Sequence, residues 1–325
     1  MHLRTGLMLL GTLFSVGLVT GAQAAPDYPK RPITLVVPYA PGGPTDTAAR
    51  ILAQGLQEST GANVIVENVP GGGATVGSGQ VSRAKPDGYT LLWGGKSTHA
   101  LAPNLRPDLS YHPFNSFEPV AMVGSQPYVL TVRTDSPYKS AADLVKDAKA
   151  RPGALNYSSP GIGSAPHLAS ELFVLRTGID ARHIPYKGGA PAMMAVLSGE
   201  VDYYIDTPTL PKTQAEGGKV RLLGVSSKDR LPDMPDVPTF KELGYDGLEM
   251  QTWFGIFAPK DTPQDIVNWL NEKINAVLRD PKAAQALANA GFDVEIMTPQ
   301  QFGQYVHDES ERWGKIIRGA NISIQ

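Results

Sequence analysis

The 325-residue sequence predicts an α/β protein built as two lobes joined at a hinge. Short apolar runs rich in Val, Ile and Leu alternate with amphipathic stretches along most of the chain, and glycine-rich turns separate them. Two long extended segments, 118–133 and 249–258, interrupt this alternation. An extended segment too long for one sheet is a good candidate for a crossing between domains. Two such crossings predict a hinged pair of α/β lobes, an architecture that commonly closes around a small ligand.

The N-terminal segment 1–24 predicts an export signal. Arg4 supplies a positive charge, an apolar run follows over 7–19, and Ala22-Gln23-Ala24 gives the small-x-small cleavage pattern before Ala25. A membrane anchor is the alternative, but the run is shorter than the roughly 20 residues that a spanning helix needs. The chain contains no cysteine, which excludes disulfides, thiolate catalysis and Cys-ligated zinc. These features predict a periplasmic protein.

The charge composition argues against a nucleic-acid partner. The chain has 29 Lys and Arg residues against 31 Asp and Glu residues, and both signs are mixed along the sequence. A protein that binds a polyanion normally carries an excess of basic residues gathered in a patch. We therefore expect no nucleic-acid partner.

The first hundred residues of the mature chain predict a mostly parallel sheet with covering helices. Strand-like runs cover 33–37, 63–67 and 90–93. Amphipathic spacing predicts a helix over 45–58, and a second helix follows the glycine-rich turn over 70–85. Strands that alternate with helices in this order usually pair in parallel.

The alternation restarts after the first crossing. Predicted helices cover 141–150, 166–177 and 191–197, and predicted strands cover 155–157, 183–186, 201–206 and 221–226. The second crossing returns the chain to the first lobe, and the remaining segment 263–320 is mainly helical, with Pro281 interrupting it. We expect the first lobe to comprise 25–126 and 251–325, and the second lobe to comprise 127–250.

A glycine-rich loop over 38–46 follows the first predicted strand. Its two glycines let the backbone approach a ligand, and Thr45 or Asp46 is suited to cap the following helix, which leaves backbone amides available to an anion. The loop lacks the Gly-Lys-Ser/Thr ending of a phosphate-binding P-loop. A plain turn between a strand and a helix is the alternative interpretation.

A loop of the same kind lies in the second predicted lobe, over 158–167. Ser164 is suited to cap the helix, Pro166 suits its first turn, and Gly161 and Gly163 bring backbone amides forward. Two helix N-termini that face each other across a cleft would hold one carboxylate.

The segment 93–99 ends a predicted strand, where side chains would face the cleft. Lys96 could pair with a second carboxylate of the ligand, and Ser97 or Thr98 could donate hydrogen bonds. The alternative is a solvated lysine beside a histidine with satisfied hydrogen bonds. Four aromatic side chains could offer flat surfaces to an aromatic diacid, although buried aromatics are more often plain core. These are Tyr39, Trp93, Trp253 and Phe254.

An enzyme is the rival reading, and the sequence gives it little support. The six histidines show no His-x-x-x-His pair, and the nucleophile motif Gly-x-Ser-x-Gly is absent. Ser164 lies near His167, but its place before a proline at a helix start is better explained by capping. We predict no catalytic residue, no metal site and no cofactor.

Several motifs together resemble the periplasmic receptors of tripartite tricarboxylate transporters, the Bug-type solute-binding family. They span nearly the whole mature chain in the family's order. They are Tyr28-Pro29, Pro32, Pro38 to Gly43 with Asp46 and Arg50, Glu67 to Gly71 with Gly77, Pro86 to Leu91, Gly161 to Ser164 with His167 and Glu171, Pro185 to Gly188 with Pro191-Ala192, Ala258-Pro259 and Thr262-Pro263. The chain departs from the family's usual residues at Tyr39, Ala40, Arg106 and His112.

The resemblance implies a type II periplasmic-binding-protein fold that closes on a ligand carboxylate, which is held between the two loops partly through ordered waters. The positions that match on the first lobe are Tyr39, Gly42, Gly43 and Asp46. Those that match on the second are Ser158, Gly161, Gly163, Ser164, His167 and Asp206. With Lys96, Ser97, Thr98 and His99, these form the predicted ligand-binding set.

Residues and resemblance together predict a monomeric receptor that captures a small organic carboxylate and delivers it to a membrane permease. A dicarboxylate is expected, and an aromatic diacid such as terephthalate is among the candidates. Two alternatives remain at this point. One is a receptor that signals to a membrane sensor, and the other is a periplasmic hydrolase.

Overall fold

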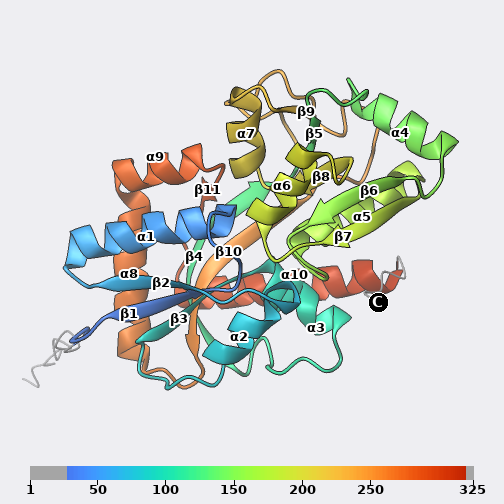
Figure 1. The fold of residues 1–325 in the computed structure, drawn as a ribbon. Coiled ribbons are helices and arrows are strands. Elements are labelled where there is room, and N and C mark those ends of the chain that lie inside the picture. The colour runs from blue at the N-terminus through green and yellow to red at the C-terminus, as the bar shows by residue number, and fades with distance from the viewer. Residues whose placement is uncertain (1–27, 320–325) are drawn as a thin grey trace, which may run out of the picture.

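The computed structural model describes residues 28–319 and contains two α/β lobes, each built on its own sheet (Figure 1). One sheet has six strands in the order β11-β4-β10-β3-β1-β2, and the other has five in the order β7-β6-β8-β5-β9. This confirms the predicted two-lobed α/β architecture. The predicted export signal lies outside the described residues.

The six-stranded lobe, called lobe 1 below, is mixed in strand direction. Its strands are β1 (Ile33–Val37), β2 (Val64–Asn68), β3 (Thr90–Gly95), β4 (Phe117–Pro127), β10 (Gln251–Pro259) and β11 (Asp293–Val294). Its helices are α1 (Pro44–Thr60), α2 (Thr75–Val81), α3 (Ala102–Leu105), α8 (Gln264–Arg279), α9 (Pro281–Asn289) and α10 (Pro299–Gly319), with short turns η1 (Gly72–Ala74) and η2 (Lys96–Leu101). Strands β1 to β3 pair in parallel, as predicted, whereas β4, β10 and β11 pair antiparallel.

The five-stranded lobe, lobe 2, follows the predicted alternation with one addition. Its strands are β5 (Val129–Arg133), β6 (Leu155–Ser159), β7 (Ala181–Pro185), β8 (Tyr203–Asp206) and β9 (Val220–Val225). Its helices are α4 (Ala141–Ala150), α5 (Ala165–Thr177), α6 (Gly189–Ser198) and α7 (Thr209–Glu216). Helix α7 was not expected from the sequence, because it buries only Pro211 and so lacks the apolar stripe that predicts a helix.

The two crossings between the lobes lie side by side. The first is the step from Pro127, which ends β4, to Val129, which begins β5. In the second, the chain leaves β9 at Val225 and enters β10 at Gln251. Gln251 pairs with Pro127 across the two strands, so both crossings pass through one narrow hinge. The exact division of the chain at 127 and 251 stays a prediction.

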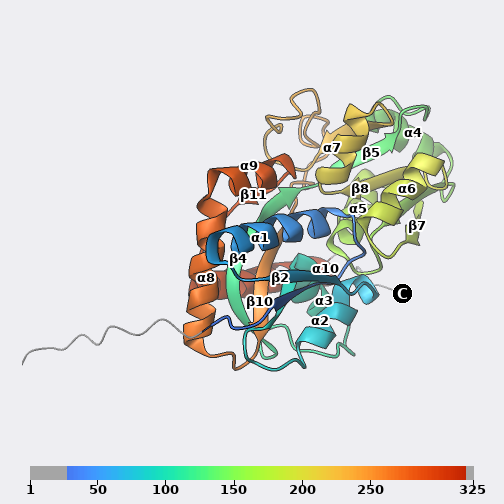
Figure 2. The same ribbon diagram turned by 60° about the vertical axis from the view of Figure 1, so that its left-hand side comes forward.

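The sheet of lobe 1 is covered on both faces, because successive residues of a strand point to opposite sides. Leu35 of β1 packs in one apolar cluster with Leu52 of α1 and Leu270 of α8. Val36, its neighbour, packs in a second cluster with Phe302 of α10. Helices α1 and α2 accordingly lie on opposite sides of the sheet (Figures 1 and 2).

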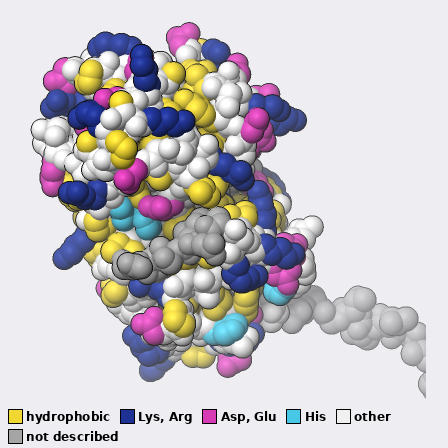
Figure 3. Space-filling view, turned by 90° about the vertical axis from the view of Figure 1, so that its right-hand side faces the viewer, with side chains coloured by type: hydrophobic (Ala, Val, Ile, Leu, Met, Phe, Trp, Pro, Cys, Tyr) yellow, Lys and Arg dark blue, Asp and Glu magenta, His cyan; other side chains and the backbone are white. Residues whose placement is uncertain are grey.

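The surface carries both signs of charge. On the face drawn in Figure 3, Lys and Arg side chains lie interspersed with Asp and Glu side chains over both lobes. Among the described residues, no helix has the length and apolar character needed to cross a membrane.

Candidate functional site

A small cavity lies between the two lobes and is lined by both. Its volume is about 30 Å³. Lobe 1 contributes Tyr39, Pro44, Thr45, Ser97, Thr252 and Phe254, and lobe 2 contributes Pro160, Ala165, Pro166, Gly189, Asp206 and Thr207. We call this cavity the cleft.

Three helices begin at the cleft. Pro44 and Thr45 open α1, Ala165 and Pro166 open α5, and Gly189 opens α6. The first backbone N–H groups of a helix have no acceptor within the helix, and its N-terminus carries a partial positive charge. The cleft is therefore a favourable place for an anion. The first two helix starts were predicted to meet there; the third was missed.

The loop before α1 is organised by Asp46. Its carboxylate accepts hydrogen bonds from Gly42 N (2.9 Å), Asn68 Nδ2 (3.0 Å) and Arg50 Nε (3.0 Å). Burial opposes the ionised form, but these hydrogen bonds outweigh it and hold the pKa of Asp46 below its usual range. Asp46 thus ties the loop to the next strand.

The predicted capping of α1 by Thr45 or Asp46 is wrong. The N-cap is Gly43, and no side chain caps the helix. Pro44 occupies the first helical turn, where its fixed φ is favourable and its missing N–H costs nothing. The helix therefore starts before Thr45, and both candidates lie inside it.

The loop before α5 behaves as predicted at its cap. Ser164 is the N-cap, and its Oγ accepts a hydrogen bond from His167 N at 3.3 Å. Two other loop amides have acceptors within lobe 2: Gly161 N donates to Ser159 Oγ (3.1 Å) and Gly163 N to His167 Nδ1 (3.1 Å). These bonds stiffen the loop in this conformation, and direct contact of the Gly161 and Gly163 amides with a ligand stays a prediction.

Ser97 joins the lobes across the cleft. Its Oγ accepts hydrogen bonds from Ala165 N of lobe 2 and from the Tyr39 hydroxyl, both at 2.9 Å. With two donors already directed at this oxygen, the Ser97 proton is free to donate into the cleft. Burial raises the pKa of Tyr39, so its phenol stays neutral and keeps its proton for Ser97.

Asp206 and Thr207 supply the polar groups of lobe 2. Asp206 is 3% exposed, and burial raises the pKa of its carboxyl to about 6 despite hydrogen bonds from the Tyr204 hydroxyl and Thr207 N. The Thr207 hydroxyl is buried and lies close enough to the Asp206 carboxyl to lower its pKa, but it makes no hydrogen bond of good geometry to any described residue. A buried hydroxyl without a partner is costly, so a ligand that bonds to it would gain affinity.

Lys96 turns its side chain away from the cleft. Its ammonium donates to the backbone carbonyl of Gln251, lies 3.5 Å from Glu309 Oε2 and sits 4.4 Å from the centre of the Trp313 ring. Burial lowers the pKa of Lys96 to about 8. In this conformation the amine interacts with other protein groups and not with the cleft, and a ligand contact at Lys96 stays a prediction.

Three further members of the predicted set do not line the cleft. Thr98 Oγ1 accepts from Gly95 N at 3.0 Å, and Ser158 Oγ donates to Ala192 O at 3.0 Å. His99 stacks on Phe257 with ring centres 3.7 Å apart, and burial lowers its pKa to about 3. Each of these side chains supports the fold around the cleft.

The predicted set therefore contributes Tyr39, Ser97 and Asp206 to the cleft lining, while its glycines, Ser164 and His167 belong to the two loops beside it. Sequence reasoning missed Thr207, Thr252, Pro160 and Gly189 as lining residues. Gly188 and Gly189 follow a strand, as the glycines of the other two loops do. The same pattern could therefore have identified the third helix start.

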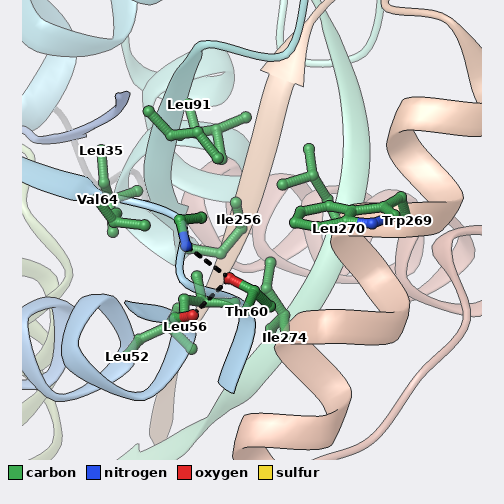
Figure 4. A pocket seen from close by; sticks show the side chains of 12 residues that line it. Leu35, Leu52, Leu56, Thr60, Val64, Leu91, Ile256, Trp269, Leu270 and Ile274 are labelled. Atoms are coloured by element: carbon green, nitrogen blue, oxygen red, sulfur yellow. Dashed lines mark hydrogen bonds between the residues drawn. The ribbon is translucent and has the colours of Figure 1, made fainter. Parts of the chain in front are cut away.

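A second cavity, within lobe 1, lacks the polar groups expected of a ligand site. It is enclosed by apolar side chains between the lobe 1 sheet and helices α1 and α8 (Figure 4). Its volume is about 10 Å³, and the one polar side chain on its lining, Thr60, already bonds to Leu56 O and Ala62 N. Such a space is a packing defect of the core.

The described residues offer no cluster of three His, Cys, Asp or Glu side chains placed to hold a metal ion. The polar groups at the cleft are hydroxyls, one carboxyl and helix N-termini. This donor set suits an anion with hydrogen-bonding oxygens.

Comparison with protein families gives a match over most of the chain. A family model described as the tripartite tricarboxylate transporter family receptor matches residues 48–322. BugT of Bordetella pertussis is 36% identical over 326 residues, and the match covers 100% of each chain.

Solved structures agree in fold and sequence. The periplasmic binding protein BugD superposes with a TM-score of 0.87 at 37% identity, covering 92% of this chain and 100% of that one. A protein of R. palustris with adipate gives 0.88 at 34% identity over 91% of this chain and 99% of its own. MatC from Rhodopseudomonas palustris with bound malate gives 0.85 at 33% identity over 89% and 100%.

Proposed function

Since this chain belongs to the tripartite tricarboxylate transporter receptor family, we propose that it captures a small organic dicarboxylate in its cleft and delivers it to a transporter of that type. It is a solute-binding receptor by family, and its most similar solved relatives include a periplasmic binding protein. The periplasm is accordingly its proposed location. The proposed ligand class follows from the cleft and from the relatives together.

The convergence of three helix N-termini on one cavity carries this proposal. No Lys, Arg or His side chain is among the residues that line the cleft. A carboxylate there would be stabilised by helix dipoles and by hydroxyl donors such as Ser97 and Thr207. Exclusion of water on closure would strengthen each of these hydrogen bonds.

The size of the ligand is proposed from the relatives. Adipate and malate occupy the structures of two similar proteins, which supports an aliphatic chain of about four to six carbons. The cavity of about 30 Å³ is too small for any dicarboxylate, so an aliphatic diacid would need a wider cleft than this conformation has, and so would an aromatic diacid such as terephthalate. Terephthalate remains in the panel of test compounds because Phe254 lines the cavity.

The test is a thermal-shift screen of the mature protein, residues 25–325, against mono-, di- and tricarboxylates, followed by titration calorimetry of each hit. A ligand at a hundredfold excess over its Kd stabilises the folded state by about 2.7 kcal/mol. We expect hits confined to aliphatic dicarboxylates. A protein that is folded, free of carried-over ligand and silent to the whole panel would contradict the proposal.

A matched pair of variants assigns any hit to the cleft. Thr207→Val removes a hydroxyl that lines the cavity and should weaken binding by about tenfold. Thr213→Val makes the same change on the exposed face of α7 and should leave the Kd unchanged. Equal effects of the two variants would place the ligand elsewhere.

Delivery to a permease is the part of the proposal that needs a cellular test. Uptake of the identified dicarboxylate should be lost when the gene for this receptor is deleted, and should return with the wild-type gene but not with the Thr207→Val variant at limiting ligand. Uptake that persists without the receptor would favour the alternative role of a sensor.

A further inference from the structure

The boundary between the lobes falls at two peptide bonds. On the lobe 2 side, Ser226 holds both crossings: its Oγ accepts from Tyr128 N (2.7 Å) and donates to Met250 O (2.5 Å), and its carbonyl accepts from Met250 N (3.1 Å). On the lobe 1 side, Gln251 pairs with Pro127. We therefore expect any rotation between the lobes to be concentrated between 127 and 128 and between 250 and 251.

Lys96 holds the lobe 1 side of this hinge. Its ammonium donates to the carbonyl of Gln251, the first residue beyond the boundary. Only 3% of the Lys96 residue is exposed, and Glu309 of α10 supplies the countercharge. Glu309 also accepts hydrogen bonds from Trp253 Nε1 (3.2 Å) and Arg312 Nη1 (3.0 Å), so the ion pair is part of a network that joins β10 to α10.

The same short turn reaches the cleft. Lys96 and Ser97 are adjacent in the π-helical turn η2, and their side chains leave it in different directions. Lys96 bonds to the hinge, whereas Ser97 accepts a hydrogen bond from Ala165 N of lobe 2. The turn η2 therefore contacts both the hinge, through Lys96, and lobe 2, through Ser97.

We propose that Lys96 is a positioning residue that anchors the hinge at Gln251, so that lobe closure brings Ala165 onto Ser97 in register. Its anchoring of the hinge is independent of the ligand. Its effect on ligand retention rests on the proposed function. In this role Lys96 acts through the backbone of Gln251 and not through a ligand contact.

The first experiment measures amide hydrogen exchange in the full mature chain without ligand, in wild type and in Lys96→Met. We expect exchange to become about tenfold faster for the amides of 250–253, because the hinge loses a charged hydrogen bond. Amides at the centre of β1 should be unchanged. Faster exchange throughout the chain would mean global destabilisation, and unchanged exchange at the hinge would mean no anchoring; either result overturns the proposal.

The second experiment measures ligand dissociation by stopped flow with the dicarboxylate that binds wild type most tightly. Lys96→Met should raise koff by about tenfold and change kon by less than about twofold, since a loose hinge shortens the life of the closed state. An unchanged koff would overturn the link to closure. If wild type binds no carboxylate, the proposed function fails while hydrogen exchange still decides the role of Lys96.

Two further variants test whether the effects of Lys96→Met depend on the position of this lysine at the hinge and on its buried charge. Lys228→Met is the control, because Lys228 is exposed and lines the same cavity of about 190 Å³ behind the hinge but bonds to neither Gln251 nor Glu309. It should behave as wild type in both experiments. The double variant Lys96→Met with Glu309→Gln removes the buried charge of both partners. It should reproduce the exchange and koff of the single variant, and it replaces that variant if Glu309, which has lost Lys96 and keeps Arg312 as its cation partner, prevents folding.

Discussion

At the scale of single residues, the cleft is notable for holding a carboxyl group where an anion is expected. Asp206 is buried beside the helix N-termini, and within 28–319 no basic side chain lines the cavity to offset its charge. Burial alone raises its pKa, and a bound carboxylate nearby would raise it further. Ligand binding and the protonation of Asp206 are therefore coupled.

This coupling predicts a pH dependence with a definite sign. Asp206, with a pKa of about 6, is mostly ionised at neutral pH, so binding an anion takes up a proton. Affinity should rise severalfold as the pH falls from about 8 towards about 6, and calorimetry in buffers of different ionisation enthalpy should detect the proton uptake. Asp206→Asn should bind with a Kd that no longer changes over this range. A wild-type affinity that falls with acid would contradict the assignment.

Single residues of the site also differ in whether the sequence could predict their position. Ser97 could be predicted because polar side chains at strand ends face a cleft in two-lobed folds, whereas Asp206 was predicted from the resemblance to the receptor family. The direction of Lys96 could not, because it depends on the η2 turn being π-helical and on Glu309, more than two hundred residues later in the chain. Which of two adjacent side chains faces the cleft is decided by packing that no local pattern records.

At the scale of elements, the loop before α1 distinguishes its two glycines. Gly42 has φ +80°, a conformation that other residues adopt at a cost, whereas Gly43 has φ −87° as the N-cap. A Cβ on Gly43 would meet Gly189 N and Ala190 N of lobe 2 at 3.7 and 3.8 Å. Gly43 is therefore free in backbone conformation, and a Cβ there would make ordinary van der Waals contact with the opposite lobe, so only a larger side chain would press against it.

The two positions should respond differently to substitution. Gly43→Val should weaken ligand binding by about tenfold or more, because its methyl groups enter the contact between closed lobes, and it should leave the melting temperature of the unliganded protein nearly unchanged. Gly42→Ala should show the reverse, with about 1 kcal/mol lost from the free energy of unfolding. Urea denaturation and calorimetry on both variants test this. Normal binding by Gly43→Val would remove this loop from the closing surface.

A second element, the C-terminal end of α3, carries a bond across the lobes. Arg106 Nη2 donates to Ile162 O of the α5 loop at 3.0 Å. Arg106→Ala should raise koff about three- to tenfold with little change in kon, because only the closed state contains this bond. Arg31→Ala, which breaks an exposed ion pair with Asp87 in lobe 1, is the control. Equal off-rates for the two variants would show that Arg106 does not hold the lobes together.

At the scale of the whole molecule, the architecture could be read from the sequence to a large extent. The alternation of strands and helices and the two long extended segments identified both lobes and the hinge. Strand β11 and helix α7 were missed: the first has two residues, and the second fully buries only Pro211, so neither leaves a periodic signal. The mixed direction of the lobe 1 sheet was also beyond local patterns, because it depends on where β4 and β10 enter after crossing the hinge.

The position of β10 has a consequence for how the molecule is made. Lobe 2 uses one continuous stretch of chain, whereas β10 lies between β3 and β4 in the centre of the lobe 1 sheet. The sheet of lobe 1 cannot be completed until the chain beyond Gln251 is available, so its folding depends on contacts between distant parts of the sequence. We expect lobe 2 to acquire structure first and lobe 1 to fold last, around a strand that arrives after its neighbours.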